Sequence, residues 1–236
     1  MPSGRFITLE GGEGTGKSTQ ASRLAERLSA GGLEVVLTRE PGGSEGAEAL
    51  RGLLLQGAAD RWSPVSETLL MYAARRDHLE KLIRPALARG AWVICDRFFD
   101  STRAYQGAGG GAPEALIAAL ETEVVGSSRP DLTLVLDLPV QTGLARAGAR
   151  TAFDRIEARG KDFHQRLRQA FLDIAAREPD RCAVIDASPP PDEVAGALEK
   201  NSGSRRASST GMFRRALPSS TSRSSTSRSG CERAAT

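Results

Sequence analysis

The chain has 236 residues, a length that is enough for one α/β domain with a full core. Its hydrophobic fraction of 39% is low because residues 200–236 contain few apolar side chains. Its formal net charge of +3 is unevenly distributed, because residues 200–236 carry eight Lys or Arg against one Glu, and residues 1–199 carry a net −4. The basic character therefore does not indicate a nucleic-acid-binding domain. No apolar run approaches ~18 residues, as a membrane span would require. With three widely spaced cysteines and no metal spacing, we expect a cytoplasmic protein without membrane or specific nucleic-acid partners.

Five short apolar runs predict β-strands. They are rich in Val, Ile and Leu and alternate little, as is typical of parallel strands covered by helices on both faces. The runs are residues 6–10, 35–38, 92–95, 132–137 and 183–186.

Helical patterns lie between these runs. The predicted helices are residues 17–30, 44–56, 63–89 with a kink at Pro85, 113–125, 165–177 and a last one from about Asp192. Strands that alternate with helices imply right-handed crossovers and a parallel sheet. The fold class is therefore a three-layer α/β fold, a five-stranded parallel sheet with helices on both faces and a ligand crevice at the carboxyl ends of the strands.

Two segments do not fit this regular pattern. Residues 146–163 are basic, contain glycine and are weakly periodic, and we interpret them as a mobile flap over the site. Residues 200–236 are mostly Ser, Thr, Arg, Gly and Ala, which predicts a disordered tail. We therefore place one domain at residues 1–199 and the tail at 200–236.

The loop after the first strand carries the strongest motif, GGEGTGKS. Its glycines let consecutive backbone N–H groups converge on phosphate oxygens, and the following helix adds the positive end of its dipole. In this pattern Lys17 reaches the β- and γ-phosphates and Ser18 binds Mg²⁺. The ATP-binding residues expected here are Gly11, Gly12, Glu13, Gly14, Thr15, Gly16, Lys17, Ser18 and Thr19.

Two further motifs follow other predicted strands. Asp96, after the third strand, can hold a magnesium ion or accept a proton, and Arg97 beside it can bind a phosphate. Arg39 precedes the tight turn Pro41-Gly42-Gly43 and points toward the same crevice. Taken singly, Asp96 could be a surface ion pair and Arg39 an ordinary loop arginine.

Several other polar residues receive structural interpretations. We expect His78 and His164 to be helix-surface or capping residues without a catalytic role. Asp137, before Pro139, is expected to cap the next helix. Trp62 and Trp92 are interpreted as packing residues.

Together these motifs resemble the bacterial thymidylate kinase family, over about residues 4–199. The resemblance is carried by FITLEGGEGTGKSTQ at 6–20, TREPGG at 38–43, DR at 96–97 with Ser101 and Ala104-Tyr105-Gln106, RPDLTLVLD at 129–137, and DRIE at 154–157. It implies a P-loop kinase fold, a homodimer, and the phosphorylation of dTMP to dTDP by direct in-line transfer from ATP with Mg²⁺.

The resemblance also implies roles for single residues. Those implied for catalysis are Lys17, Asp96, Arg97 and Arg155, and those for the metal are Ser18 and Asp96. Those implied for dTMP are Glu13, Arg39, Met71, Arg75, Arg97, Ser101, Tyr105 and Gln106. The three arginines in that set would bind the dTMP phosphate, Tyr105 would crowd the 2′ position of the sugar, and Ser101 and Gln106 would face the thymine. Arg155 and Arg150 would move in with the flap toward ATP.

Three features depart from the family pattern. Met71 stands where the family usually has a phenylalanine that stacks on thymine, and Gly148 stands where related flaps often carry an arginine. The family's last helix usually continues where the Ser/Arg-rich tail begins here. The alternatives are another nucleoside monophosphate kinase, a slow ATP-hydrolysing P-loop switch, or a nucleic-acid binder acting through its tail.

Overall fold

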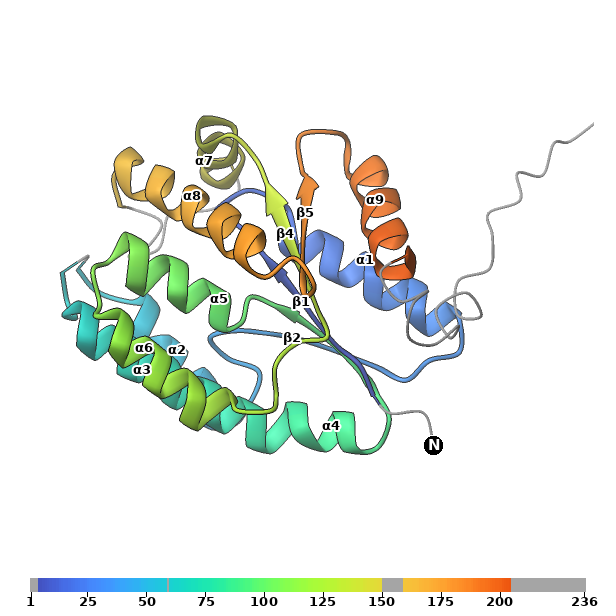
Figure 1. Ribbon diagram of the computed structural model, residues 1–236, viewed down its shortest axis with the longest axis horizontal. Coiled ribbons are helices and arrows are strands. Elements are labelled where there is room, and N and C mark those ends of the chain that lie inside the picture. The colour runs from blue at the N-terminus through green and yellow to red at the C-terminus, as the bar shows by residue number, and fades with distance from the viewer. Residues whose placement is uncertain (1–3, 59, 150–158, 205–236) are drawn as a thin grey trace, which may run out of the picture.

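The computed structural model describes residues 4–58, 60–149 and 159–204, the last three by their backbone alone. Its five strands form one parallel sheet, as predicted, and their order is β2-β3-β1-β4-β5 (Figure 1). The strands are β1 Phe6–Glu10, β2 Val35–Arg39, β3 Trp92–Asp96, β4 Leu132–Asp137 and β5 Cys182–Asp186. All five predicted runs are confirmed, and β2, β3 and β5 are each one residue longer than predicted.

Sheet order brings the predicted motifs to one edge. The central strand β1 pairs with β3, with Leu9 opposite Asp96, and β3 pairs with β2, with Arg39 opposite Asp96. Because parallel strands end at the same edge, the segments that follow β1, β2 and β3 lie next to one another there.

Each predicted helix has a counterpart in the structure, and further helical segments follow β3 and β4. They are α1 Lys17–Ala30, α2 Glu45–Leu55, α3 Pro64–His78, α4 Arg84–Ala88, α5 Phe99–Thr102, α6 Glu114–Leu120, α7 Val140–Gly148, α8 Lys161–Arg177 and α9 Pro191–Ser204, with π-helical stretches η1 Leu79–Ile83, η2 Arg103–Gly109 and η3 Glu121–Val125. The stretch η1 lies just before Pro85, where the kink was predicted, because proline cannot donate within the helix and crowds the preceding turn.

The helices cover both faces of the sheet (Figure 1). On one face α1 and α9 pack against β1, β4 and β5, through residues such as Leu24, Leu28 and Leu198. On the other face α3, η1 and α5 pack against β1 and β3, with Tyr72, Phe98 and Phe99 buried between them. Among the described residues no helix is long and apolar enough to cross a membrane.

The segments around the predicted flap are more helical than expected. Helix α7 runs to Gly148 and α8 begins at Lys161, so both ends of the 146–163 segment are helical. The part between them, with Arg150 and Arg155, lies largely outside the described residues. Helix α9 continues to Ser204, past the proposed boundary at Lys200, and the boundary stays a prediction.

Helix α7 also packs directly against the glycine-rich loop of residues 11–18, the phosphate loop. Gly14 has φ 67°, and a Cβ there would lie 2.0 Å from the carbonyl oxygen of Gly143 in α7. A Cβ on Gly143 would in turn lie 2.4 Å from the carbonyl oxygen of Glu13. Glycine at both positions is therefore required for the two backbones to touch.

The surface position expected of His78 and His164 was wrong, and so was the cap expected of Asp137. His78 is fully buried and shares hydrogen bonds with Thr38 (2.8 Å) and Glu40 (3.1 Å), and His164 is also buried. Asp137 does not cap α7, because its carboxylate accepts both hydrogen bonds of the Arg168 fork at 2.7 and 2.8 Å. For His78 and Asp137 the partners come from distant parts of the chain.

Candidate active site

A cavity of about 440 Å³ opens at the carboxyl edge of the sheet. A volume of this size is typical of small-ligand sites. Among the predicted residues that line it are Glu13, Gly14, Gly16, Lys17, Ser18, Arg39, Met71, Arg75, Asp96, Arg97, Ser101, Tyr105 and Gln106. Gly11, Gly12 and Thr15 line a smaller hollow behind the loop, Thr19 is exposed in α1, and Arg150 and Arg155 lie outside the described residues.

Lys17 is held inside the glycine-rich loop. Its ammonium donates to the carbonyl oxygen of Gly12 at 2.7 Å, and its side chain is buried. Burial, followed by the positive charge of Arg97, lowers the pKa of Lys17 to about 8. A buried ammonium at the start of a helix is suited to binding an anion, which would restore its charge balance.

Ser18 and Asp96 form the oxygen pair predicted to bind a metal. Ser18 Oγ donates to Asp96 Oδ2 at 2.5 Å, and Asp96 Oδ1 is buried without a hydrogen-bond partner among the described residues. In the part of the chain that the structure describes, no group of three or more His, Cys, Asp or Glu could hold a metal. The Ser18 hydroxyl and the Asp96 carboxylate are hard oxygen donors and fit Mg²⁺, which takes few protein ligands and keeps water or phosphate oxygens in its shell.

Arg97 links the phosphate loop to the segment after β3. Its backbone is left-handed, with φ 71°, which is rare for a residue with a side chain. Its guanidinium donates to the Gly11 carbonyl at 2.9 Å and to Glu13 Oε1 at 2.9 Å, and it lies 4.9 Å from the centre of the Tyr105 ring. Tyr105 also donates to Glu13 Oε1. Burial lowers the pKa of Arg97, but the Glu13 carboxylate and other nearby acidic groups more than offset this and keep the guanidinium charged.

Arg75 is the most deeply buried cation of the cavity wall. Its side chain is 2% exposed, and it donates from Nε to Glu40 at 2.8 Å and from one terminal nitrogen to Thr102 at 3.0 Å. The other terminal nitrogen, Nη1, is buried without a hydrogen-bond partner among the described residues. Because an unsatisfied charged donor is costly, this atom indicates a place for an acceptor on a ligand.

Arg39 lies at the rim of the cavity. It is exposed and pairs with Glu48 at 3.1 Å. The backbone N–H of Gly43 and the nearby arginines lower the pKa of Glu48. A ligand phosphate would have to compete with this surface ion pair, which is worth only about 0–1 kcal/mol.

Several residues that line or support the cavity were not predicted from the sequence. Arg51 of α2 and Phe98 line the cavity, and Arg51 donates to the Pro41 carbonyl at 2.6 Å. Glu10, Glu40 and Glu67 are buried carboxyl groups that contact lining residues. The available signal was a carboxyl group at the end of a buried strand, at Glu10, since a buried charge requires partners.

Glu10 caps the helix that follows Arg97. Its Oε1 accepts hydrogen bonds from the backbone N–H groups of Phe98 (2.8 Å) and Ser101 (3.2 Å), and its Oε2 accepts one from the Ser101 hydroxyl (2.6 Å). Both N–H groups belong to the start of α5, where a helix leaves its first donors exposed, and the Ser101 N–H is shared with the Phe98 carbonyl at 3.1 Å. Burial, and next the charge of Asp100, raise the pKa of Glu10 to about 7.

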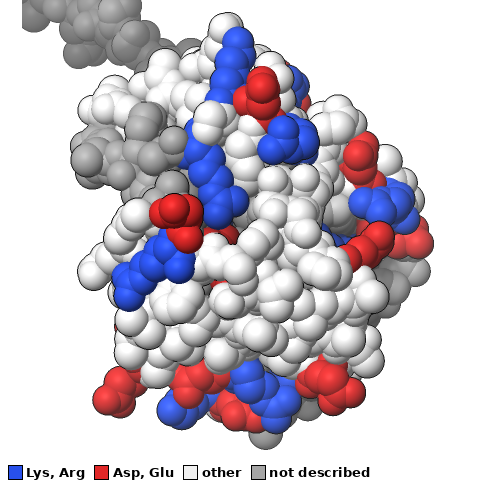
Figure 2. Space-filling view, turned by 90° about the vertical axis from the view of Figure 1, so that its left-hand side faces the viewer, with Lys and Arg blue, Asp and Glu red and all other residues white. Residues whose placement is uncertain are grey.

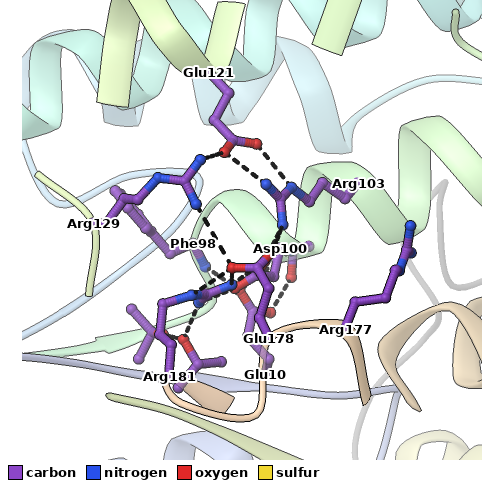
Figure 3. A network of polar contacts seen from close by, with 12 residues as sticks. Glu10, Phe98, Asp100, Arg103, Glu121, Arg129, Arg177, Glu178 and Arg181 are labelled. Atoms are coloured by element: carbon purple, nitrogen blue, oxygen red, sulfur yellow. Dashed lines mark hydrogen bonds and ion pairs between the residues drawn. The ribbon is translucent and has the colours of Figure 1, made fainter. Parts of the chain in front are cut away.

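A network of ion pairs lies behind Glu10 (Figure 3). Asp100 accepts from both terminal nitrogens of Arg181, at 2.7 and 3.0 Å, and Glu121 accepts from Arg103 and Arg129. All three guanidinium groups lie about the Phe99 ring, 4.7 to 5.4 Å from its centre. The network anchors α5 and η2, which carry Ser101, Tyr105 and Gln106 into the cavity.

Several known proteins that this chain resembles in sequence and in structure carry the same name. The family model described as thymidylate kinase matches residues 9–197. The thymidylate kinase of Caulobacter vibrioides is 65% identical over 198 residues, covering 84% of this chain and 95% of the relative. That of Bradyrhizobium diazoefficiens is 55% identical, covering 83% and 87%. The crystal structure of thymidylate kinase from Ehrlichia chaffeensis is 38% identical, with a TM-score of 0.70, and covers 85% of this chain and 99% of that one.

The raised pKa of Glu10 predicts how the stability of the folded chain depends on pH. Its ordinary pKa of 4.5 is raised to about 7 in the folded chain, so between these values the folded state binds more protons and stability falls as pH rises. Glu10→Gln cannot titrate and keeps an oxygen for the two N–H groups. We expect the melting temperature of the wild type, measured relative to that of Glu10→Gln, to fall by several degrees from pH 5 to pH 8. A difference that is flat with pH would contradict the raised pKa.

Proposed function

This chain belongs to the thymidylate kinase family, and from that premise we propose that it transfers the γ-phosphoryl group of ATP to dTMP, giving ADP and dTDP. The observation that carries the proposal is the shared cavity, in which the phosphate loop faces the arginines of the acceptor wall. A phosphoryl transfer needs two nucleotides in line and neutralised charge more than it needs covalent chemistry. From these substrates we expect the chain to act in the cytoplasm.

The donor half is proposed to consist of the glycine-rich loop, Lys17 and Ser18. The backbone N–H groups and the Lys17 ammonium would bind the β- and γ-phosphates of ATP. Ser18 and Asp96 would hold Mg²⁺, which when bound neutralises charge on the phosphates. The buried Oδ1 of Asp96, without a partner among the described residues, supports this assignment.

The acceptor half is proposed to bind dTMP by its phosphate and its base. Arg75 and Arg97, with Arg39 at the rim, would bind the phosphate, and the unsatisfied Nη1 of Arg75 supports the first of these. Glu13 and Tyr105 would contact the sugar and phosphate, with Tyr105 crowding the 2′ position. Ser101, Gln106 and Met71 would face the thymine.

The reaction proposed is a single displacement. An oxygen of the dTMP phosphate forms a bond to the γ-phosphorus while the bond from that phosphorus to the β–γ bridging oxygen breaks, so ADP leaves. Lys17 and the arginines bind the charged oxygens, and the low-dielectric cavity strengthens these interactions. Arg155 and Arg150, which the family resemblance assigns to this step, are proposed to complete the positive charge around the γ-phosphate.

The proposed acceptor predicts a ranking of monophosphates. In a coupled ADP-release assay with ATP and Mg²⁺, we expect dTMP to give a higher kcat/KM than dUMP, dCMP or AMP. Lys17→Ala is the control for contaminating kinases, and it should abolish transfer while dTMP binding is retained. A higher rank for another monophosphate would identify a different nucleoside monophosphate kinase. ATP hydrolysis without dTDP would indicate a switch protein.

Arg155 predicts a separation of kcat from KM. If its guanidinium binds the transferring phosphoryl group, Arg155→Ala should lower kcat by about 10³-fold or more. The KM for dTMP should change only a few-fold, because the contact is made in the transition state. Arg155→Lys keeps the positive charge but lacks the planar guanidinium, so its kcat should lie between those of the wild type and Arg155→Ala. A pure KM effect would remove Arg155 from the reacting phosphoryl group.

We further propose that the chain forms a homodimer through α2 and α3. These two helices pack side by side and expose Leu53 and Leu69, at 43% and 47%, with Val65 at 41%. Figure 2 looks onto one side of the molecule, where charged side chains gather toward the rims around a largely uncharged middle. Exposed large apolar side chains close together, as Leu53, Val65 and Leu69 are on α2 and α3, are typical of a protein–protein interface.

The dimer proposal is tested by molar mass in solution. Light scattering at micromolar concentration should give twice the chain mass for the wild type, and Leu69→Glu should shift it toward the monomer. Val184→Glu is the matched control, since Val184 is equally exposed, at 47%, on the opposite edge strand β5. A monomeric wild type, or equal dissociation by both variants, would contradict the assignment of this face.

A further inference from the structure

Gln106 lines the cavity, and its side-chain amide is bound from behind by a buried carboxylate. Gln106 Nε2 donates to Oε1 of Glu67 in α3 at 2.8 Å. Glu67 is 1% exposed and also pairs with Arg159, whose terminal nitrogen lies 3.3 Å from Oε2. Arg159 in turn stacks over the ring of Phe163, 4.7 Å from its centre. The Glu67 carboxylate, on α3, is thus contacted by two other segments: by η2 through Gln106, and by the residues just before α8 through Arg159.

This arrangement determines which end of the Gln106 amide faces the ligand. A carboxylate accepts hydrogen bonds but has none to donate, so the amide nitrogen must face Glu67. The amide oxygen is then left for the cavity. The two ends of the amide have nearly the same shape, so packing alone does not choose between the two orientations, and the hydrogen bond to Glu67 does.

The oxygen matters because the pyrimidine bases differ in ring hydrogens. Thymine and uracil carry a hydrogen on N3, which an amide oxygen accepts. Cytosine has an unprotonated N3, which is itself an acceptor, so an oxygen opposite it leaves two buried acceptors unpaired. A site with only an acceptor there would favour a base with a ring N–H by leaving the other unsatisfied.

We propose that Glu67 is a positioning residue that fixes the Gln106 amide with its oxygen toward the base, and thereby selects monophosphates whose base carries a ring N–H. This inference rests on the proposed dTMP site. It assigns no contact between Glu67 and the substrate. Its effect is on the choice of base and not on the transfer step.

The test is the selectivity of Glu67→Gln in the ADP-release assay. The amide that this substitution introduces can offer either its oxygen or its nitrogen to Gln106, so the Gln106 amide can turn its nitrogen toward the base. We expect the ratio of kcat/KM for dTMP to that for dCMP to fall about tenfold. The ratio of dTMP to dUMP should stay unchanged, since both bases carry the N3 hydrogen. A loss of packing alone would not separate these two ratios.

Two further variants make the test specific. Gln106→Ala removes the amide, so adding Glu67→Gln to it should not change the dTMP to dCMP ratio again. Glu80→Gln is the matched control, in the stretch η1 that continues α3. Its exposed carboxylate pairs with Arg76, and both ratios should stay at the wild-type values. If Glu67→Gln does not fold, Glu67→Met fills a similar volume without a strong hydrogen-bonding atom and is expected to lower the same ratio.

The outcomes distinguish this inference from the proposed function. A wild type that does not prefer dTMP would overturn the proposed function. A wild type that prefers dTMP, with a Glu67→Gln variant that keeps its dTMP to dCMP ratio, would overturn only the role of Glu67. Equal losses for dCMP and dUMP discrimination, or an additive effect in the double variant, would also overturn that role.

Discussion

The hydrogen bonds of Glu10 hold the two halves of the cavity in register. Glu10 is the last residue of β1 and directly precedes the phosphate loop, and it accepts from the two N–H groups at the start of α5. The loop proposed to bind ATP therefore follows Glu10 in the sequence. The segment proposed to bind dTMP is hydrogen-bonded to the Glu10 side chain. Without this cap the Phe98 N–H would lose its hydrogen bond, at a cost of about 1–3 kcal/mol, whereas the Ser101 N–H would keep its contact with the Phe98 carbonyl at 3.1 Å. The left-handed backbone of Arg97 lies between these anchors and is held by its own N–H bond to the Leu9 carbonyl at 2.9 Å.

The cations of the cavity are fixed in place before a nucleotide binds. Arg97 is held by Glu13, and Arg75 by Glu40, in surroundings that exclude water from most of each side chain. The desolvation cost of these charges is therefore met during folding, and a phosphate that enters finds donors already oriented. Arg39 is different, because its partner Glu48 is exposed and the pair can separate at little cost. The ion pairs around Phe99 extend this rigidity to α5 and η2.

Local sequence signals were sufficient for the sheet and for the phosphate loop. Buried parallel strands are nearly continuous apolar runs, and the glycine-rich loop has a fixed spacing, so neither depends on distant residues. The errors concern residues whose surroundings are decided by the tertiary structure. His78 and His164 lie on helices whose buried faces could not be told from their polar character, and Asp137 finds its partner Arg168 in α8. Glu10 and Glu67 were missed for the same reason, since a lone carboxyl group reveals no partner in the sequence. The roles of Arg150 and Arg155 still rest on the family resemblance.

Four carboxyl groups share one relation to the cavity. Glu13, Glu40, Glu67 and Glu10 each bind a different residue that lines it: Arg97, Arg75, Gln106 and Ser101 respectively. The lining residues present hydrogen-bonding atoms to the ligand, and the carboxyl groups beside or behind them decide how these atoms are oriented. Because a carboxylate can only accept, Glu13, Glu40 and Glu67 each hold a flexible or ambiguous side chain in one orientation. Glu13 and Glu40 themselves line the cavity, whereas Glu10 and Glu67 lie behind its lining. Exchange of Glu10 or Glu67 would leave the contact atoms of Ser101 and Gln106 present and change the direction in which they point. The supporting carboxyl groups therefore orient the residues that a nucleotide would touch.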